Sequence, residues 1–129
     1  MIAIALVLAL FEVGAGAWAF LAPHPFAEVV ATFAPFNAHF LHDAGAFQLG
    51  LGAALLVALA RRRGLVVAFA ANLVADAVHV VAHVEDSRLG GHPYDVPLLT
   101  LIALLAAAGL VLAIRAERAR DAIKREVHK

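Results

Sequence analysis

Four polar residues at helical spacing interrupt an apolar stretch between residues 65 and 84. They are Asn72, Asp76, His79 and His83, separated by four, three and four positions. On an α-helix this spacing places all four side chains on one narrow stripe. A charged side chain at the centre of a bilayer costs roughly 2.5–3.5 kcal/mol on the insertion scale, so the stripe must face protein, water or a ligand. The stripe therefore predicts where this chain could do chemistry.

A second set of such residues lies in the stretch Asn37–Asp43, which contains His39, His42 and Asp43. His39 and Asp43 are four residues apart and can share one helical face. The turn Arg61-Arg62-Arg63-Gly64 that separates this segment from the stripe is very short. We therefore expect the two helices to be antiparallel neighbours whose outer ends meet.

Histidines at positions i and i+4 can hold one metal ion, and His79 and His83 have this spacing. The sequence predicts a site in which His42, His79 and His83 are ligands, with His39 as a further candidate. Imidazole and carboxylate ligands suit zinc, iron or copper, and haem is a second cofactor hypothesis. No glutamate follows His79, which excludes the zinc-protease motif.

The carboxylates would orient the ligands or act as acid and base. Asp43 and Asp76 have this role in the metal hypothesis, with Glu12 as a more distant partner. A metal-free alternative uses the same groups as a buried acid/base pocket that isomerises, cyclises or hydrates a lipid-soluble substrate. The enzyme class thus stays open between a metal-dependent oxidoreductase and an acid/base isomerase or cyclase. In both hypotheses the substrate is a small or lipid-like molecule.

A structural interpretation competes with both. Polar residues in membrane bundles often bridge helices, at about 0.6 kcal/mol per contact. The protein would then be a non-enzymatic accessory subunit of a larger membrane complex, or a homo-oligomer. Transport across the membrane is disfavoured, because the inner halves of the apolar segments consist almost entirely of Ala, Leu, Ile, Val and Gly.

The composition indicates a membrane protein. Of the 129 residues, 64% are hydrophobic and 16% charged, and the mean hydropathy is +0.88. A soluble domain of this size would expose much of that surface to water. The chain has no cysteine, which excludes disulfides, thiolate metal ligands and cysteine nucleophiles.

Four apolar segments approach the ~20 residues needed to cross the hydrocarbon core. They predict an all-α, up-down four-helix transmembrane bundle with spans at Ile2–Leu21, Ala38–Ala60, Leu65–Val84 and Val96–Ile114. The first segment has no basic start and contains Glu12, which favours a retained span over a signal peptide. Phe26–Phe33 is expected to form a short interfacial helix. Residues 1–114 would form the bundle, and residues 115–129 a charged cytoplasmic helical tail.

The charges predict the orientation. Nine basic residues fall on one side of this topology, and only Arg88 on the other: Arg61, Arg62, Arg63, Arg115, Arg118, Arg120, Lys124, Arg125 and Lys129. By the positive-inside rule both termini are cytoplasmic. Acidic residues interleave with the basic ones in the tail, which is typical of a solvated helix and not of a nucleic-acid-binding arm.

The same topology gathers six of the seven histidines in the outer half of the molecule: His24, His39, His42, His79, His83 and His92. His128 is expected on the inner side. This gathering is the main reason for placing the predicted site at the outer rim.

The first half of the chain resembles a known family. The proline-ended first span (Phe20-Leu-Ala-Pro23), the amphipathic connector and the glycine-rich segment Asp43–Gly52 are similar to the small four-helix bacterial membrane proteins of the DoxX-like group. The resemblance covers roughly residues 1–60 and implies a multi-pass protein of the bacterial inner membrane. Some proteins of this kind are linked to quinone or thiol redox systems, but the cysteines that redox members can carry are absent here.

Overall fold

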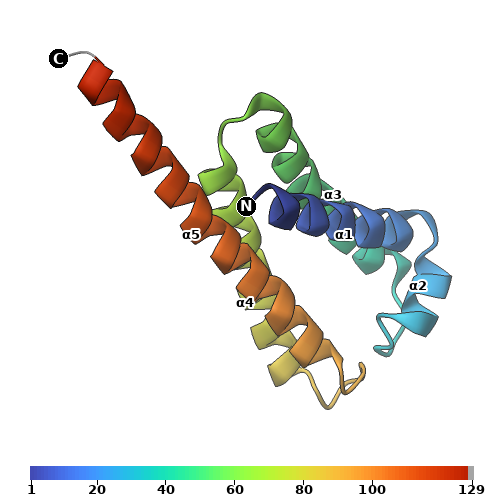
Figure 1. Cartoon of the computed structure of the whole chain (residues 1–129). Helices are drawn as coiled ribbons and strands as arrows, with labels where there is room; N and C mark the ends of the chain where they lie inside the picture. The colour runs from blue at the N-terminus through green and yellow to red at the C-terminus, as the bar shows by residue number, and fades with distance from the viewer. Residues whose placement is uncertain (128–129) are drawn as a thin grey trace.

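The computed structural model describes residues 1–127 and consists of five helices (Figure 1). They are α1 (Ile2–Leu21), α2 (Pro23–Val29), α3 (Ala38–Arg61), α4 (Leu65–Glu85) and α5 (Asp95–Val127). The four long helices correspond to the four predicted spans, so the all-α four-helix bundle is confirmed. The predicted positions of His128 and Lys129 lie outside the described residues.

The observed boundaries differ clearly from the predicted ones at the short connecting helix, whereas the last span continues into a helical tail as predicted. The short helix α2 covers Pro23–Val29 and not Phe26–Phe33, because proline, which ends α1, is also compatible with the first turn of the next helix. The last span begins at Asp95 and continues as one helix to Val127. The charged residues after Ile114 therefore extend α5 without a break.

Local signals explain where α3 begins and ends. The side chain of Asn37 accepts a hydrogen bond from the backbone N–H of Phe40 at 3.2 Å, which is an N-cap worth about 1 kcal/mol. At the other end, Arg62 and Gly64 adopt left-handed backbone angles, with φ of 51° and 81°. These two residues reverse the chain tightly enough for α4 to begin at Leu65.

Small residues bring α1 and α3 together. A Cβ atom added to Gly16 would lie 2.8 Å from the carbonyl oxygen of Gly45, and one added to Gly45 would lie 2.7 Å from that of Gly16. The two backbones are therefore in direct contact, as in other membrane helix pairs built on small residues. The pair α4 and α5 interlocks differently: the ring of Phe69, which is fully buried, fills the space beside Gly109.

The side chains divide into an apolar core and an apolar outer surface. The main core comes from all four long helices: Ala5, Leu8, Ala9, Leu55, Ala58, Leu65, Ala68, Phe69, Ile102, Ala106 and Ala113. Valines of α4 such as Val67, Val74 and Val78 are more than 60% exposed. Each long helix is long and apolar enough to cross a membrane. The chain is therefore a multi-pass membrane protein, with its exposed apolar faces solvated by lipid.

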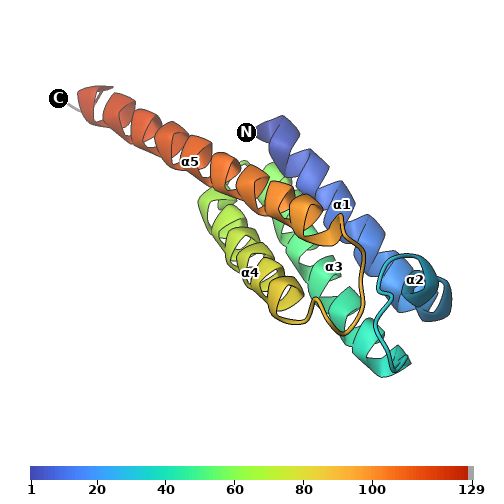
Figure 2. The ribbon, with the colours of Figure 1, turned by 90° about the horizontal axis from the view of Figure 1, so that it is seen from below.

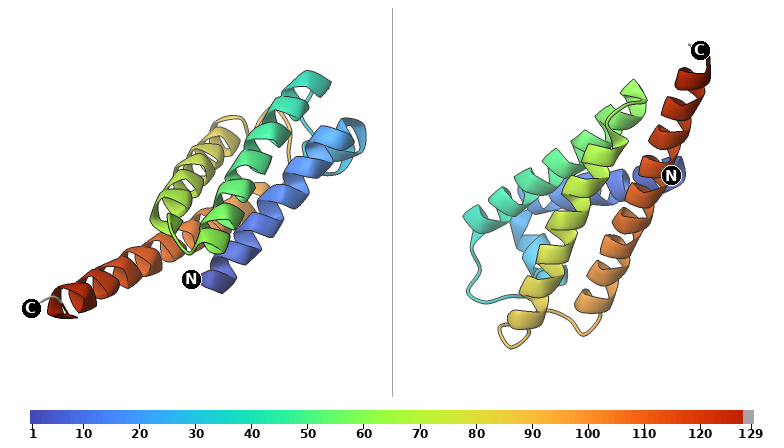
Figure 3. Two further views of the ribbon diagram at one scale, coloured as in Figure 1. Left: turned by 90° about the horizontal axis from the view of Figure 1, so that it is seen from above. Right: turned by 90° about the vertical axis from the view of Figure 1, so that its left-hand side faces the viewer.

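Figure 3 shows the up-down arrangement of the helices. The N-terminus, the α3–α4 turn and the far half of α5 lie toward one end, here called the turn end. At the other end are α2, the first residues of α3, the last residues of α4 and the α4–α5 connection; this is the α2 end. Figures 1 and 2 show that α3 and α4 are close at their shared turn and separate toward the α2 end.

Candidate functional site

The polar stripe of α4 runs from the interior of the bundle to the α2 end. Asn72 and Asp76 are buried, with exposures of 0% and 7%. One and two turns further on, the rings of His79 and His83 meet, with their centroids 4.7 Å apart. Their Nε2 atoms are separated by 3.1 Å. The predicted stripe therefore forms as expected, and its two halves lie in different surroundings.

The partner of His83 on its other side is Asp95, the first residue of α5. Asp95 Oδ2 lies 3.7 Å from His83 Nδ1, and the two side chains are only 13% and 18% exposed. The same oxygen accepts a hydrogen bond from the backbone N–H of His92 at 2.7 Å. One imidazole thus has a carboxylate on its Nδ1 side and a second imidazole on its Nε2 side.

Asp95 was missed by sequence reasoning, although a signal was available. The connection between α4 and α5 spans only residues 86–94, so the last turn of α4 must lie beside the first turn of α5. Asp95 is the acidic residue of that first turn.

Two connecting segments at the α2 end, residues 30–37 and 86–94, cover His83 and Asp95. Phe33 meets the ring of His83 edge-on, with centroids 5.5 Å apart and an interplanar angle of 86°. The backbone of Phe33 pairs with that of Gly90, and His92 Nε2 lies 3.2 Å from the carbonyl oxygen of Val29. A Cβ atom on Gly91 would lie 2.8 Å from Asp95 Oδ2. Contacts from α2 and the segment after it thus hold the connection against the site.

The separation of the two imidazoles is compatible with metal coordination. Two nitrogens bound to one tetrahedral zinc ion at about 2.0–2.1 Å lie roughly 3.3 Å apart, close to the 3.1 Å between His79 and His83. The same separation also fits a hydrogen bond between neutral rings. Asp95 lies 3.7 Å from His83 on its Nδ1 side, the side from which a carboxylate orients a metal-binding histidine when it accepts the ring N–H.

The other predicted ligands lie elsewhere at the α2 end. His42 stacks at a tilt on Phe20 of α1, with ring centroids 5.2 Å apart. His39 and Asp43 form an i, i+4 pair at 3.6 Å, but their side chains are 85% and 58% exposed. Their shared helical face is as predicted, and it is directed to the outside of the bundle.

The expected meeting of α3 and α4 at the α2 end does not occur. Residues 1–127 contain no group of three or more His, Asp or Glu side chains arranged to hold a metal ion, so His42, His79 and His83 do not form the predicted three-histidine centre. The reason is helix pairing: α3 packs on α1 through Gly16 and Gly45, and α4 packs on α5. The short turn joins α3 and α4 at one end only.

A second polar group lies deeper in the bundle. Glu12 of α1 is only 2% exposed, and its Cβ would be 3.1 Å from a Cβ atom on Gly52 of α3. It lies at the same depth in the bundle as Asp76 of α4, because the two residues are ten and eleven positions from the starts of their helices at the turn end. Asn72 completes this group, which we call the buried oxygen cluster: Glu12, Asn72 and Asp76.

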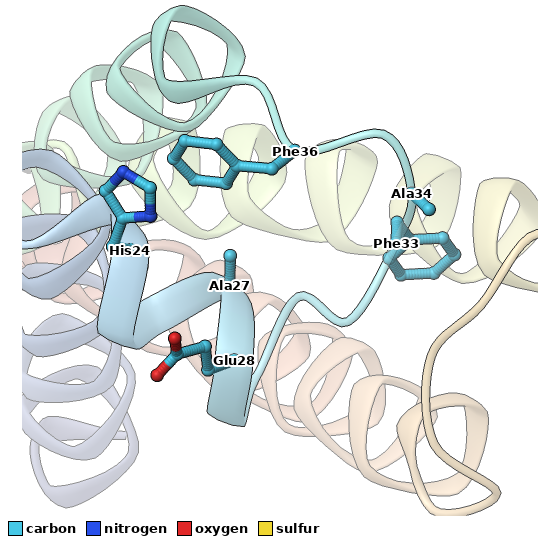
Figure 4. Close-up of a pocket in the computed structure, with 6 residues that line it drawn as sticks. All are labelled: His24, Ala27, Glu28, Phe33, Ala34 and Phe36. Atoms are coloured by element: carbon cyan, nitrogen blue, oxygen red, sulfur yellow. The ribbon is translucent and has the colours of Figure 1, made fainter.

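Two cavities lie near these groups. The larger, of about 340 Å³, is formed by α2 and the segment after it. The rings of His24 and Phe36 stack on each other with centroids 4.1 Å apart, and Figure 4 shows Phe33 away from them at the far side. The smaller, of about 220 Å³, is an apolar groove between α4 and α5, lined by Leu73, Ala77, Val80, Thr100, Ala103, Leu104 and Ala107. Neither cavity is lined by His42, His79 or His83, so neither offers a haem pocket with one of these histidines as axial ligand.

Fold and composition together define a multi-pass, four-helix membrane protein with a pair of histidines and a carboxylate at one end. Comparison of the chain with family models, with curated proteins and with solved structures gives no match.

Proposed function

We propose that His79 and His83 together bind one transition-metal ion, with Asp95 behind His83, and present it to a small or lipid-like molecule at the membrane surface. The observation that carries this proposal is the 3.1 Å separation of the two Nε2 atoms. The Nδ1 of His83 faces Asp95, which leaves its Nε2 directed toward His79. The two Nε2 atoms are therefore close enough to each other to bind the same ion.

The donor set favours zinc, copper or iron among the common metals. Neutral imidazole is a ligand for all three, whereas magnesium and calcium prefer oxygen. A carboxylate behind His83 would raise the basicity of its ring and fix its orientation. With two protein ligands, a four-coordinate ion keeps two positions for water or substrate, as a catalytic and not a structural site requires.

The groove between α4 and α5 supports a lipid-like molecule as the substrate. It is almost entirely apolar, and its lining residue Val80 follows His79 directly in the chain. An acyl or isoprenoid chain in this groove would have its polar end near the metal. Buried apolar contact contributes about 25 cal/mol per Å², which suits a ligand held mainly by its chain.

The histidine pair would lie on the outer side of the membrane. Within residues 1–127, eight basic residues toward the turn end and one toward the α2 end favour cytoplasmic termini, with the histidine pair on the outer face of a bacterial inner membrane. The DoxX-like resemblance is compatible with this setting and assigns no role to any residue.

Metal binding by the purified protein tests the proposal. The full chain is prepared in detergent with an affinity tag that contains no histidine, and Zn²⁺ or Co²⁺ is titrated by calorimetry and absorption. We expect one ion per chain, lost in His79→Ala and in His83→Ala. His39→Ala is the matched control, because it removes one member of an exposed i, i+4 pair on α3. Equal binding by His83→Ala and by the unaltered chain would exclude the proposal.

A second candidate function uses the same residues without a metal. Asp95 beside His83, and His83 beside His79, form a chain of proton donors and acceptors from α5 to the surface of α4. Such a relay could move a proton to or from a lipid-soluble substrate. This alternative predicts no stoichiometric metal, together with specific chemical reactivity of His79 that Asp95→Asn reduces.

A further inference from the structure

The buried oxygen cluster lies at the centre of the membrane-spanning part of the protein. Glu12 is ten residues above the start of α1 and Asp76 eleven above the start of α4, so both are about 15–17 Å from the turn end at 1.5 Å per residue. Gly52 of α3 contributes no side chain at this depth and leaves room for Glu12. Two helices thus place carboxyl groups at the same level.

Two oxygens of the cluster have no hydrogen-bond partner within residues 1–127: Asn72 Oδ1 and Asp76 Oδ2. The amide nitrogen of Asn72 donates to the carbonyl oxygen of Ala68 at 2.9 Å, one turn toward the start of α4. Its amide oxygen remains without a donor, and Asp76 follows one turn further on along the same helix. A fully buried acceptor without a donor costs about 1–3 kcal/mol, so a bound partner that satisfies both oxygens would stabilise the fold.

The two carboxyl groups of the cluster indicate what kind of partner would satisfy these oxygens. Two carboxylates in a low-dielectric interior repel each other and lose their hydration. The free atoms of the cluster are all oxygens, the ligands that hard cations such as Ca²⁺ and Mn²⁺ prefer. One divalent ion would neutralise both carboxylates and also satisfy the amide oxygen of Asn72. We propose that Glu12, Asp76 and Asn72 form a binding site for one hard divalent cation inside the bundle.

The polar stripe of α4 indicates from which end of the bundle the cation would reach this site. His79 lies three residues beyond Asp76, and His83 is one further turn toward the α2 end. Toward the turn end, the buried residues of α4 are Ala68, Phe69 and Leu65. The ion would therefore enter and leave at the α2 end, past the histidine pair, and would not cross to the other side.

Mn²⁺ binding tests this inference. The full-length protein in detergent is titrated with Mn²⁺ and followed by electron paramagnetic resonance, with Ca²⁺ as competitor and choline chloride at equal ionic strength as the salt control. We expect one Mn²⁺ per chain, displaced by Ca²⁺. Glu12→Gln and Asp76→Asn, which preserve side-chain size, should each weaken binding at least tenfold, and Asn72→Ala should weaken it less.

Two comparisons separate this site from the histidine pair and from misfolding. His83→Ala should keep Mn²⁺ bound, whereas loss of Mn²⁺ in this variant would assign the ion to the histidines and overturn the inference. Circular dichroism checks that Asp76→Asn is folded, and removing a buried charge is expected to preserve or raise its stability without metal. Absence of Mn²⁺ binding by the unaltered chain, or displacement of Mn²⁺ by choline chloride as complete as that by Ca²⁺, would also overturn it.

Discussion

Asp95 Oδ2 lies 3.7 Å from His83 Nδ1 and so connects the first residue of α5 to the last turn of α4. Both side chains are mostly shielded, because Phe33 and the α4–α5 connection cover them. A weakly hydrated carboxylate acts more strongly on its neighbour than an exposed one. The carboxylate of Asp95 should therefore make the other ring nitrogen of His83, Nε2, a better ligand, and this nitrogen faces His79.

Replacing Asp95 should therefore weaken metal binding without removing a ligand. We expect Asp95→Ala to lower the affinity for Zn²⁺ by about 10–100-fold, the usual effect of losing the carboxylate behind a metal-bound histidine. Asp43→Ala is the control, because Asp43 faces a histidine at a similar distance on an exposed surface. Isothermal titration of both variants measures the difference, and equal affinities would contradict the role given to Asp95.

Gly91 should be needed to keep Asp95 in place beside His83. Its φ of +87° disfavours any side chain, and a Cβ atom would lie 2.8 Å from Asp95 Oδ2. Gly91→Ala is expected to displace Asp95 and to weaken metal binding several-fold. Gly64→Ala is the control, because Gly64 has a similar backbone angle, φ +81°, but no neighbouring atom within 4 Å of an added Cβ. It should cost about 1–2 kcal/mol of stability through its left-handed conformation and leave metal affinity unchanged.

The contact between α1 and α3 should depend on two glycines and not on the others. Gly16→Ala or Gly45→Ala puts a methyl group against the opposing backbone, and such overpacking costs about 1–3 kcal/mol. Gly14→Ala and Gly50→Ala meet no atom within 4 Å and should be neutral or stabilising, by up to ~1 kcal/mol of helix propensity. Thermal unfolding in detergent distinguishes the two pairs, and equal shifts in all four variants would refute the packing.

Single cysteines test the orientation, because the natural chain contains none. A membrane-impermeant maleimide added to intact cells should label Ser87→Cys in the α4–α5 connection. It should label Arg62→Cys in the α3–α4 turn only after the cells are opened. The expected difference follows from the basic residues near the turn end, and the reverse labelling pattern would place the histidine pair in the cytoplasm.

Much of the architecture was predictable from composition and periodicity. Long apolar runs interrupted by Pro23, by the arginine turn and by the glycine- and proline-containing connection define four spans, and the structure has them. The spacing of Asn72, Asp76, His79 and His83 also predicts their common stripe, since a regular helix fixes which residues share a face. The metal, the substrate and the DoxX-like resemblance stay predictions.

Only the tertiary structure decided which neighbour each face meets. Helical spacing says nothing about partners, and this sequence offers small residues on several helices that could form close contacts. The contact of Gly16 with Gly45 joins α3 to α1, which separates His42 from the histidines of α4. The α4–α5 pairing brings Asp95 to His83. The sequence alone thus determined the spans and the polar stripe, whereas helix packing selected the residues that share a site.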